Sequence, residues 1–491
     1  MGNSKRFFSL PDLATRGFSL GSEASFTRDF SGDTYMGKKT TDVVVVGVAL
    51  FAMFFGAGNL IFPPFMGLLA GTTWSLSLLG FLITGIGMPL LGIMAAARAG
   101  GTVEHLGSRV NPLFGRIMSI VVILAIGPLL AIPRTCAVAF ELGIRPAFDT
   151  GVQPNIELMY RAVFSLIFFG ITLAFALNRS TVVDKIGKYL TPFLFVTLAF
   201  IILKGVFAPV GEIIDTGLAR PFGRGFNEGY QTMDTLASIV FAQIVIAALV
   251  FKGYTHVGDQ VKMTSFAGLI AATGLGLVYG GLMYLGATAG SEYAQDVERT
   301  DLLIGITQSL LGGGGKVALG VAVGLACLTT SIGLTATVGD YFSTLSKGKI
   351  GYTAICIFTV VFSGVFATVG VTTIVTVAVP LLVTTYPVAI CLIILTLIGR
   401  PVAHRAVYAG AVIGALSTSV FEALTAANMP VAAVNTAITH IPLAEAGFAW
   451  IVPGVLGGLI GLALAKAGVG SPVPAVVDLA DDVEEAAELS T

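Results

Sequence analysis

The stretch Phe51-Ala-Met-Phe-Phe-Gly-Ala-Gly-Asn-Leu-Ile-Phe-Pro-Pro64 interrupts an apolar segment about long enough to cross a lipid bilayer. Its centre, Gly56-Ala57-Gly58-Asn59, opposes a continuous helix. Each glycine costs roughly 1 kcal/mol of helix propensity, and the Asn side chain can hydrogen-bond to its own backbone instead. The sequence therefore predicts a helix that unwinds at residues 56–59.

An unwound segment at membrane depth carries N–H and C=O groups that protein, water or a ligand must satisfy. The two half-helices would offer N–H groups to an anion and carbonyl groups to a cation. An amino acid bound together with a metal cation fits both ends. The alternative is structural: a glycine pair at a close helix crossing, with Asn59 bonded to a neighbour.

The composition of the whole chain indicates a polytopic membrane protein. Of 491 residues, 55% are hydrophobic and 11% are charged, and the mean hydropathy is +0.90. The net charge of −1 provides no basic field for nucleic acid. Apolar runs predict an all-α fold with twelve transmembrane helices. Their expected starts lie near residues 43, 73, 115, 158, 189, 230, 265, 316, 350, 372, 403 and 446.

The distribution of Lys and Arg predicts that both termini are cytoplasmic, because short cytoplasmic loops retain positive charge. Residues 1–42 would form a cytoplasmic N-terminal tail and residues 43–467 the transporter domain. Residues 468–491, with the acidic run Asp478 to Glu488, would form a cytoplasmic C-terminal tail. Membrane lipids are then the expected surroundings of the domain.

Two further stretches carry candidate functional groups. Thr329, Thr330 and Ser331 on the eighth helix could supply uncharged oxygen ligands to a monovalent cation, or could bond back to carbonyl groups of their own helix. Asp234 on the sixth helix is ionisable within a span and so a functional candidate. It could cap a broken half-helix, line the permeation path or lie near the outer interface.

Two other classes of function are disfavoured. The stretch Leu311-Gly-Gly-Gly-Gly-Lys316-Val lacks the glycine spacing and the Ser or Thr after Lys that a phosphate-binding loop requires, so ATP is not an expected partner. We expect it to be a hinge before the eighth helix. An intramembrane aspartyl protease would need Asp234 and Asp340 at one depth, whereas they lie toward opposite ends of their spans. The chain is therefore not expected to be an enzyme.

Four motifs in order resemble the bacterial branched-chain amino acid:cation symporters, within the amino acid, polyamine and organocation superfamily. They are Phe54–Pro64, Gly127-Pro-Leu-Leu-Ala-Ile-Pro-Arg-Thr135, Gly229-Tyr-Gln-Thr-Met-Asp234 and Ala326-Cys-Leu-Thr-Thr-Ser331. The resemblance covers roughly residues 40 to 465. It implies sodium-coupled uptake of leucine, isoleucine and valine across the bacterial cytoplasmic (inner) membrane. A different solute or proton coupling on the same fold is the alternative.

The resemblance also implies the leucine-transporter fold, with two inverted repeats of five helices in which the first and sixth helices are discontinuous. The repeats would span about residues 43–208 and 230–398, with helices eleven and twelve at about 403–467. The implied sodium ligands are the carbonyls of Ala52, Phe55 and Cys327 and the hydroxyls of Thr330 and Ser331, with Thr329 beside them. The implied substrate-binding residues are Gly56, Ala57, Gly58, Asn59, Asp234, Ser238 and Phe241, and the sixth-helix break is expected between Asp234 and Phe241.

Overall fold

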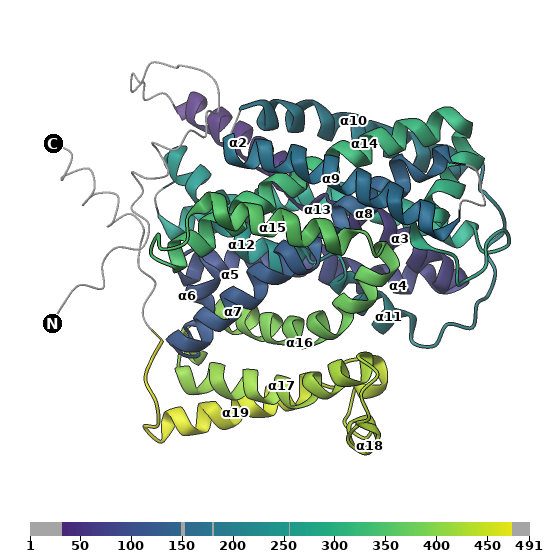
Figure 1. Ribbon diagram of the computed structural model, residues 1–491. Coiled ribbons are helices and arrows are strands. Elements are labelled where there is room, and N and C mark those ends of the chain that lie inside the picture. The colour runs from purple at the N-terminus through teal and green to yellow at the C-terminus, as the bar shows by residue number, and fades with distance from the viewer. Residues whose placement is uncertain (1–31, 149–152, 179–180, 255, 474–491) are drawn as a thin grey trace.

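In a computed structural model the described residues are 32–148, 153–178, 181–254 and 256–473, and within these ranges every regular element is a helix (Figure 1). Most of the expected N-terminal tail and most of the acidic C-terminal tail lie outside the described residues. The first helix begins at Gly32, about three turns before the expected start of the first span.

The helices follow one another along the chain without any sheet among the described residues. The α-helices are α2 (Gly32–Phe54), α3 (Gly58–Ala70), α4 (Trp74–Leu82), α5 (Met88–Ala99), α6 (Val103–Gly107), α7 (Pro112–Leu124), α8 (Ala131–Gly143), α9 (Pro154–Asn178), α10 (Thr181–Phe207), α11 (Pro221–Tyr230), α12 (Asp234–Phe251), α13 (Val257–Thr288), α14 (Arg299–Leu345), α15 (Tyr352–Ala367), α16 (Val371–Ile398), α17 (Arg405–Ala426), α18 (Ala432–Thr439) and α19 (Ile451–Lys466).

Short helical turns connect several of these elements. They are η1 (Gly71–Thr73), η2 (Ile83–Gly87), η3 (Ala125–Leu129), η4 (Arg145–Ala147), η5 (Arg400–Val402) and η6 (Ala444–Ala446). Among them η2 and η3 are π-helical turns that link α4 to α5 and α7 to α8. In η3 the backbone of Gly127 leaves helical geometry next to Pro128, which cannot donate a helical hydrogen bond.

Eight helical segments among the described residues are long and apolar enough to cross a membrane. Four further apolar helices are shorter: 40–54, 193–207, 352–367 and 451–466. Each of the twelve expected starts falls within a described helix or a few residues before one. The all-helical membrane fold is therefore confirmed, whereas the number of twelve spans and the inverted repeat stay predictions.

The interrupted helices occupy the interior of the bundle. Helix α13 packs along both α2 and α3, α12 packs along α5, and α14 packs along α8. Helices α17 and α19 lie side by side at the lower edge in Figure 1, with α16 above them. The two halves of the first broken helix are thus held by a common neighbour, α13.

Close backbone contact explains part of the high glycine content. A Cβ atom on Gly410 would lie 2.1 Å from the carbonyl oxygen of Gly457, and a Cβ on Gly457 would lie 2.1 Å from that of Gly410. Only glycine at both positions allows α17 and α19 to approach this closely. Small residues thus serve helix packing at this crossing.

The expected hinge before the eighth helix coincides with a kink in α14. Gly312 has φ 66° and ψ −163°, which lies outside helical geometry, so that α14 consists of a shorter and a longer helix joined there. A residue with a side chain is strained in this conformation. The polyglycine stretch thus forms a kink within α14, and its sequence lacks the phosphate-loop pattern.

Candidate functional site

The first interruption lies between α2 and α3 at Phe55, Gly56 and Ala57, whereas Gly58 and Asn59, which were also expected to unwind, already begin α3. The N–H of Gly56 donates to the Phe54 carbonyl at 3.1 Å instead of to Ala52, and the N–H of Asn59 donates to Gly56 at 3.2 Å instead of to Phe55. The carbonyls of Ala52 and Phe55 therefore lose their usual helical partners. Unwinding at this sequence, the central structural prediction, is confirmed.

The second interruption separates α11 from α12 and consists of Gln231, Thr232 and Met233. The predicted position, between Asp234 and Phe241, is wrong because α12 runs uninterrupted through these residues. The chain turns without glycine because Met233 adopts a left-handed conformation with φ 64°. The Thr232 hydroxyl accepts a hydrogen bond at 3.3 Å from the N–H of Asp234, the first residue of α12.

The Asn59 side chain joins the two interruptions. Its amide nitrogen lies 2.7 Å from Oδ2 of Asp234 and 2.9 Å from the Phe54 carbonyl, and it also bonds to the Tyr279 hydroxyl. Asn59 is 1% exposed and Asp234 is 5% exposed. Asn59 thus fixes the first break and links it to Asp234, the first residue of α12. Asp234 thus lies at the start of the second half-helix without capping it, and a place in the permeation path stays a prediction.

Arg134 on α8 is a residue at this junction to which the sequence analysis gave no role. Its Nη1 donates to the Gln231 carbonyl at 2.5 Å and its Nη2 lies 3.4 Å from the Thr232 carbonyl. The side chain is 5% exposed in the folded chain, and its Cζ lies 5.3 Å from the Phe62 ring centroid. The sequence feature that could have identified Arg134 as a candidate is its place within an otherwise apolar span, directly after Ile132-Pro133.

A glycine at position 58 makes room for this guanidinium. A Cβ added to Gly58 would lie 2.9 Å from Nη2 of Arg134 and 3.0 Å from the Phe62 ring. Gly58 and Asn59 are consecutive residues at the start of α3, and they contact Arg134 and Asp234 respectively. A buried cation and a buried anion thus flank one short stretch of backbone.

The predicted cation ligands on α14 lie in the protein interior. Cys327 and Ser331 are buried, and the Ser331 hydroxyl accepts a hydrogen bond from Thr172 of α9 at 3.3 Å. Thr329 donates to the Ala326 carbonyl at 3.0 Å, which is the back-bonding alternative, and Thr330 is half-buried. Across the described residues, no hydrogen bond joins this segment to Ala52 or Phe55.

The two other predicted substrate-binding residues lie within α12, beyond the break. Ser238 donates to the Thr235 carbonyl at 2.7 Å and packs against Gly92 of α5, where a Cβ would lie 2.3 Å from its hydroxyl oxygen. Phe241 is half-buried against the apolar core. The structure therefore brings together Asn59 and Asp234 but places Ser238 against another helix.

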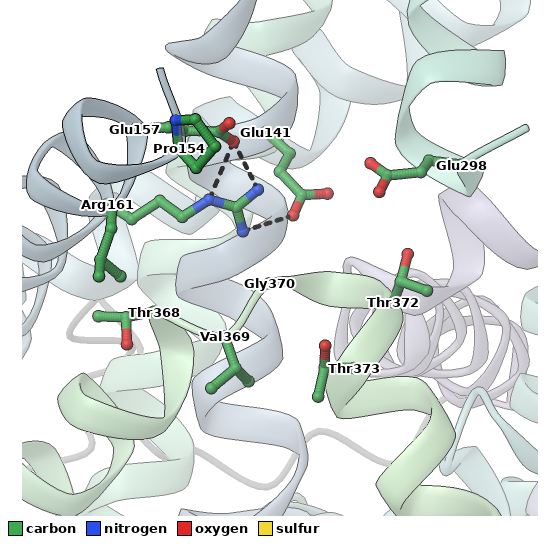
Figure 2. A pocket seen from close by; sticks show the side chains of 11 residues that line it. Glu141, Pro154, Glu157, Arg161, Glu298, Thr368, Val369, Gly370, Thr372 and Thr373 are labelled. Atoms are coloured by element: carbon green, nitrogen blue, oxygen red, sulfur yellow. Dashed lines mark hydrogen bonds and ion pairs between the residues drawn. The ribbon is translucent and has the colours of Figure 1, made fainter. Parts of the chain in front are cut away.

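A second candidate is a cavity of about 380 Å³ lined by the ends of α8, α9 and α16 (Figure 2). Glu141 accepts hydrogen bonds from Thr300 at 2.7 Å and from the Val371 N–H at 3.0 Å, and it pairs with Arg161 at 3.2 Å. Arg161 also pairs with Glu157 at 2.8 Å. Because these charges pair with one another, the cluster connects the helix ends. The Asn59–Asp234 junction is therefore the better candidate site.

Comparison with solved structures supports the fold. Mhp1 in its inward-facing conformation aligns with a TM-score of 0.57 at 14% identity, covering 90% of this chain and 94% of that one. MhsT in complex with L-phenylalanine aligns with a TM-score of 0.50 at 15% identity, covering 86% and 97%. At such low identity the likeness concerns the fold, which is the leucine-transporter fold. The class of the protein, a membrane transporter rather than an enzyme, follows from its sequence relatives.

The chain belongs to the family described as branched-chain amino acid transport protein, whose model matches residues 39–468. It is 40% identical over 428 residues to the branched-chain amino acid permease BraB of Bacillus subtilis, covering 86% of this chain and 95% of that protein. It is 37% identical over 420 residues to the branched-chain amino acid transport system 2 carrier protein of Pseudomonas aeruginosa, covering 84% and 94%. The family resemblance seen in the sequence is confirmed.

Proposed function

We propose that this protein carries leucine, isoleucine and valine into the cell together with sodium, by alternating access across a bacterial cytoplasmic membrane. The observation that carries the proposal is the buried Asn59–Asp234 hydrogen bond, which joins the two helix interruptions into one polar junction. The names of the Bacillus and Pseudomonas relatives support the class of substrate.

The backbone chemistry of the first interruption supports a zwitterionic substrate beside a cation. The carbonyls of Ala52 and Phe55 lack their helical donors, while the N–H groups of Ala57 and Gly58 donate to no acceptor among the described residues. Carbonyl oxygens suit a cation, and N–H groups at the start of α3 suit a carboxylate. Leu, Ile and Val should share the apolar part of the site, because one methylene is worth about 1–3 kcal/mol.

Sodium coupling is supported by the type of ligand that the chain offers. The freed carbonyls and the buried hydroxyl of Ser331 are uncharged oxygen donors, which suit a hard monovalent ion. Bound sodium would supply a positive charge to the site. One charge moved inward gains about 2.3 kcal/mol per 100 mV, enough for roughly 40-fold accumulation of the amino acid. A proton-coupled carrier of another small solute is the alternative.

Contacts at the ends of the helices support the proposed orientation. Lys252 pairs with Asp42 at 2.5 Å, and Arg109 bonds to the Arg98 carbonyl at 2.9 Å, in regions expected to be cytoplasmic. At the opposite helix ends, Arg145 pairs with Glu298 and Asp301. The proposed topology has twelve spans and cytoplasmic termini, with helices α2 to α10 and α11 to α16 as inverted repeats and α17 and α19 peripheral.

Uptake of labelled leucine into proteoliposomes tests the proposal. We expect uptake to fall to background when external sodium is replaced by choline, and excess isoleucine or valine to compete with leucine. Ser331→Ala should raise the sodium concentration needed for half-maximal uptake, whereas Thr337→Ala, which removes an exposed hydroxyl bonded to its own helix, should not. Uptake that persists in choline and follows an imposed proton gradient would support the alternative.

A further inference from the structure

The polar junction contains a buried positive charge to which neither the family comparison nor the sequence motifs give a role. We propose that the Arg134 guanidinium receives the α-carboxylate of the substrate, and that it thereby makes the carrier select α-amino acids over the corresponding amines. The inference rests on the proposed function, because it names the recognition element of the same site.

The Arg134 guanidinium is buried without a directly paired anion. Its side chain is 5% exposed, and no carboxylate of the described residues forms an ion pair with it within 4.0 Å. A buried guanidinium without a paired anion is costly, particularly within a membrane protein. Asp234, the buried carboxylate of the junction, is hydrogen-bonded to Asn59, so the carboxylate of a bound amino acid would provide the directly paired counter-charge that Arg134 lacks.

The guanidinium of Arg134 retains unused hydrogen-bond donors. Arginine has five N–H donors, and the carbonyls of Gln231 and Thr232 occupy two of them. The neighbouring N–H groups of Ala57 and Gly58 are also free among the described residues. Guanidinium and backbone donors together can bind both oxygens of a carboxylate, which is the geometry that arginine favours.

Two residues that are adjacent in the chain border side chains of opposite charge. Gly58 borders Arg134, and the next residue, Asn59, bonds to Asp234. The carboxylate and ammonium groups of an α-amino acid are separated by a single carbon atom and so match such a close pair of sites. In addition, the buried Oε1 atom of Gln231, within the second break, has no hydrogen-bond partner and could accept from the ammonium group.

A purely structural role for Arg134, as a cap on the carboxyl end of α11, makes a different prediction. A cap would support binding of every ligand to the same extent. A carboxylate receptor would support only ligands that possess a carboxylate. Leucinol, which retains the ammonium group and the side chain of leucine but has a hydroxyl in place of the carboxylate, separates the two roles.

The experiment measures the binding of leucine and leucinol to the purified protein in sodium. We expect the unmodified protein to bind leucinol roughly 100-fold more weakly than leucine. Arg134→Gln should weaken leucine binding roughly 30-fold and leave leucinol binding within about 3-fold, so that the preference collapses. Arg134→Lys retains the positive charge but lacks the paired N–H donors of the guanidinium, and should give an intermediate leucine-to-leucinol affinity ratio.

Arg299→Gln is the matched control. Arg299 also stacks on Phe62, with 5.6 Å between its Cζ and the ring centroid, but pairs with Glu228 at 3.2 Å. The leucine-to-leucinol ratio of this variant should equal that of the unmodified protein. Size-exclusion profiles and melting temperatures establish folding, and Arg134→Lys decides the question if Arg134→Gln does not fold.

The inference would be overturned if Arg134→Gln weakened the binding of leucine and leucinol equally. If the Gln variant does not fold, an unchanged leucine-to-leucinol affinity ratio in Arg134→Lys would overturn it. In either case Arg134 would be a helix cap only. Equal affinity of the unmodified protein for leucine and leucinol would overturn it as well. Failure of the unmodified protein to bind leucine would instead reject the proposed function, so the two failures are distinguishable.

Discussion

At the scale of single residues, the account depends on a few buried polar groups in an apolar chain. Asn59, Arg134 and Asp234 are each at least nine-tenths buried, and each hydrogen-bonds to backbone or side chains at a helix interruption. Burial of such groups is unfavourable unless their bonds are satisfied. Their positions at the interruptions are the basis of the proposed site.

Asn59→Ala should remove the link between the two interruptions. We expect leucine uptake at limiting substrate to fall at least about tenfold, and the free energy of unfolding to decrease by about 1–3 kcal/mol, because Asp234 and the Phe54 carbonyl lose a donor. Initial uptake rates and thermal melting measure the two effects. Asn178→Ala, which removes an exposed amide bonded to the Ala174 carbonyl, should leave both unchanged. Normal uptake by Asn59→Ala would contradict the proposed role of the junction.

Gly58→Ala should impair substrate binding through Arg134. The added Cβ would lie 2.9 Å from Nη2, so the guanidinium must shift away from the start of α3. We expect the concentration of leucine for half-maximal uptake to rise about tenfold, since a charge-assisted hydrogen bond contributes about 1.5–3 kcal/mol. Gly170→Ala on α9, where no atom lies within 4 Å of the added Cβ, is the matched control. Similar kinetics for the two variants would show that the close approach is unimportant.

At the scale of helices and their connections, some interruptions follow from sequence and others do not. Gly56 and Gly58 around the first break weaken the helix locally, so the break could be predicted. At the second break Met233 has φ 64°, a conformation that methionine rarely adopts and that the local sequence does not predict. It depends on tertiary contacts, above all the Arg134 bonds to the Gln231 and Thr232 carbonyls.

The same distinction applies to the candidate site. Asn59 and Asp234 could be selected because polar and ionisable groups are expensive within a span. Their direct contact could not be predicted, since 175 positions separate them in the chain. The role of Ser238 was inferred from its place within the expected break, and because the break lies at residues 231–233 instead, Ser238 is packed against α5. The coordination of a cation by both Ala52 and Ser331 stays a prediction.

Glu141→Gln should weaken the ion-pair and hydrogen-bond connection between the helix ends shown in Figure 2. The carboxylate of Glu141 joins α8 to Arg161 of α9, Thr300 of α14 and the first residue of α16. We expect the free energy of unfolding to decrease by about 1–3 kcal/mol, because an amide replaces one acceptor oxygen with a donor. Glu445→Gln, which alters an exposed pair with Arg220, should have little effect on the melting temperature. Equal melting temperatures for the two variants would contradict a stabilising role of Glu141 between the helix ends.

At the scale of the whole molecule, the fold explains why two short interruptions can serve as one site. Helix α13 packs along α2 and α3 and contributes Tyr279 to the Asn59 junction. Helix α8 carries Arg134, which bonds to the second interruption, while α17 packs mainly on α19 and α16. The site is therefore assembled from helices of both proposed repeats, and relative motion of those helices would change access to it.

Cotransport of a cation with a zwitterion should move net charge. In planar-membrane recordings of the reconstituted protein, leucine should evoke an inward current in sodium that disappears in choline. Net charge moves because the amino acid contributes none and each coupled cation contributes one. Saturating leucine uptake with no current would contradict cation symport while leaving the fold assignment intact.

The most direct test of the central claim is the structure of the protein in lipid nanodiscs with bound leucine and sodium. The account predicts leucine between residues 55–59 and 231–234, with its carboxylate at Arg134 and the start of α3 and its ammonium group at Asp234. Leucine bound elsewhere, for example in the Glu141 cavity, or a continuous helix through residues 54–58, would contradict it.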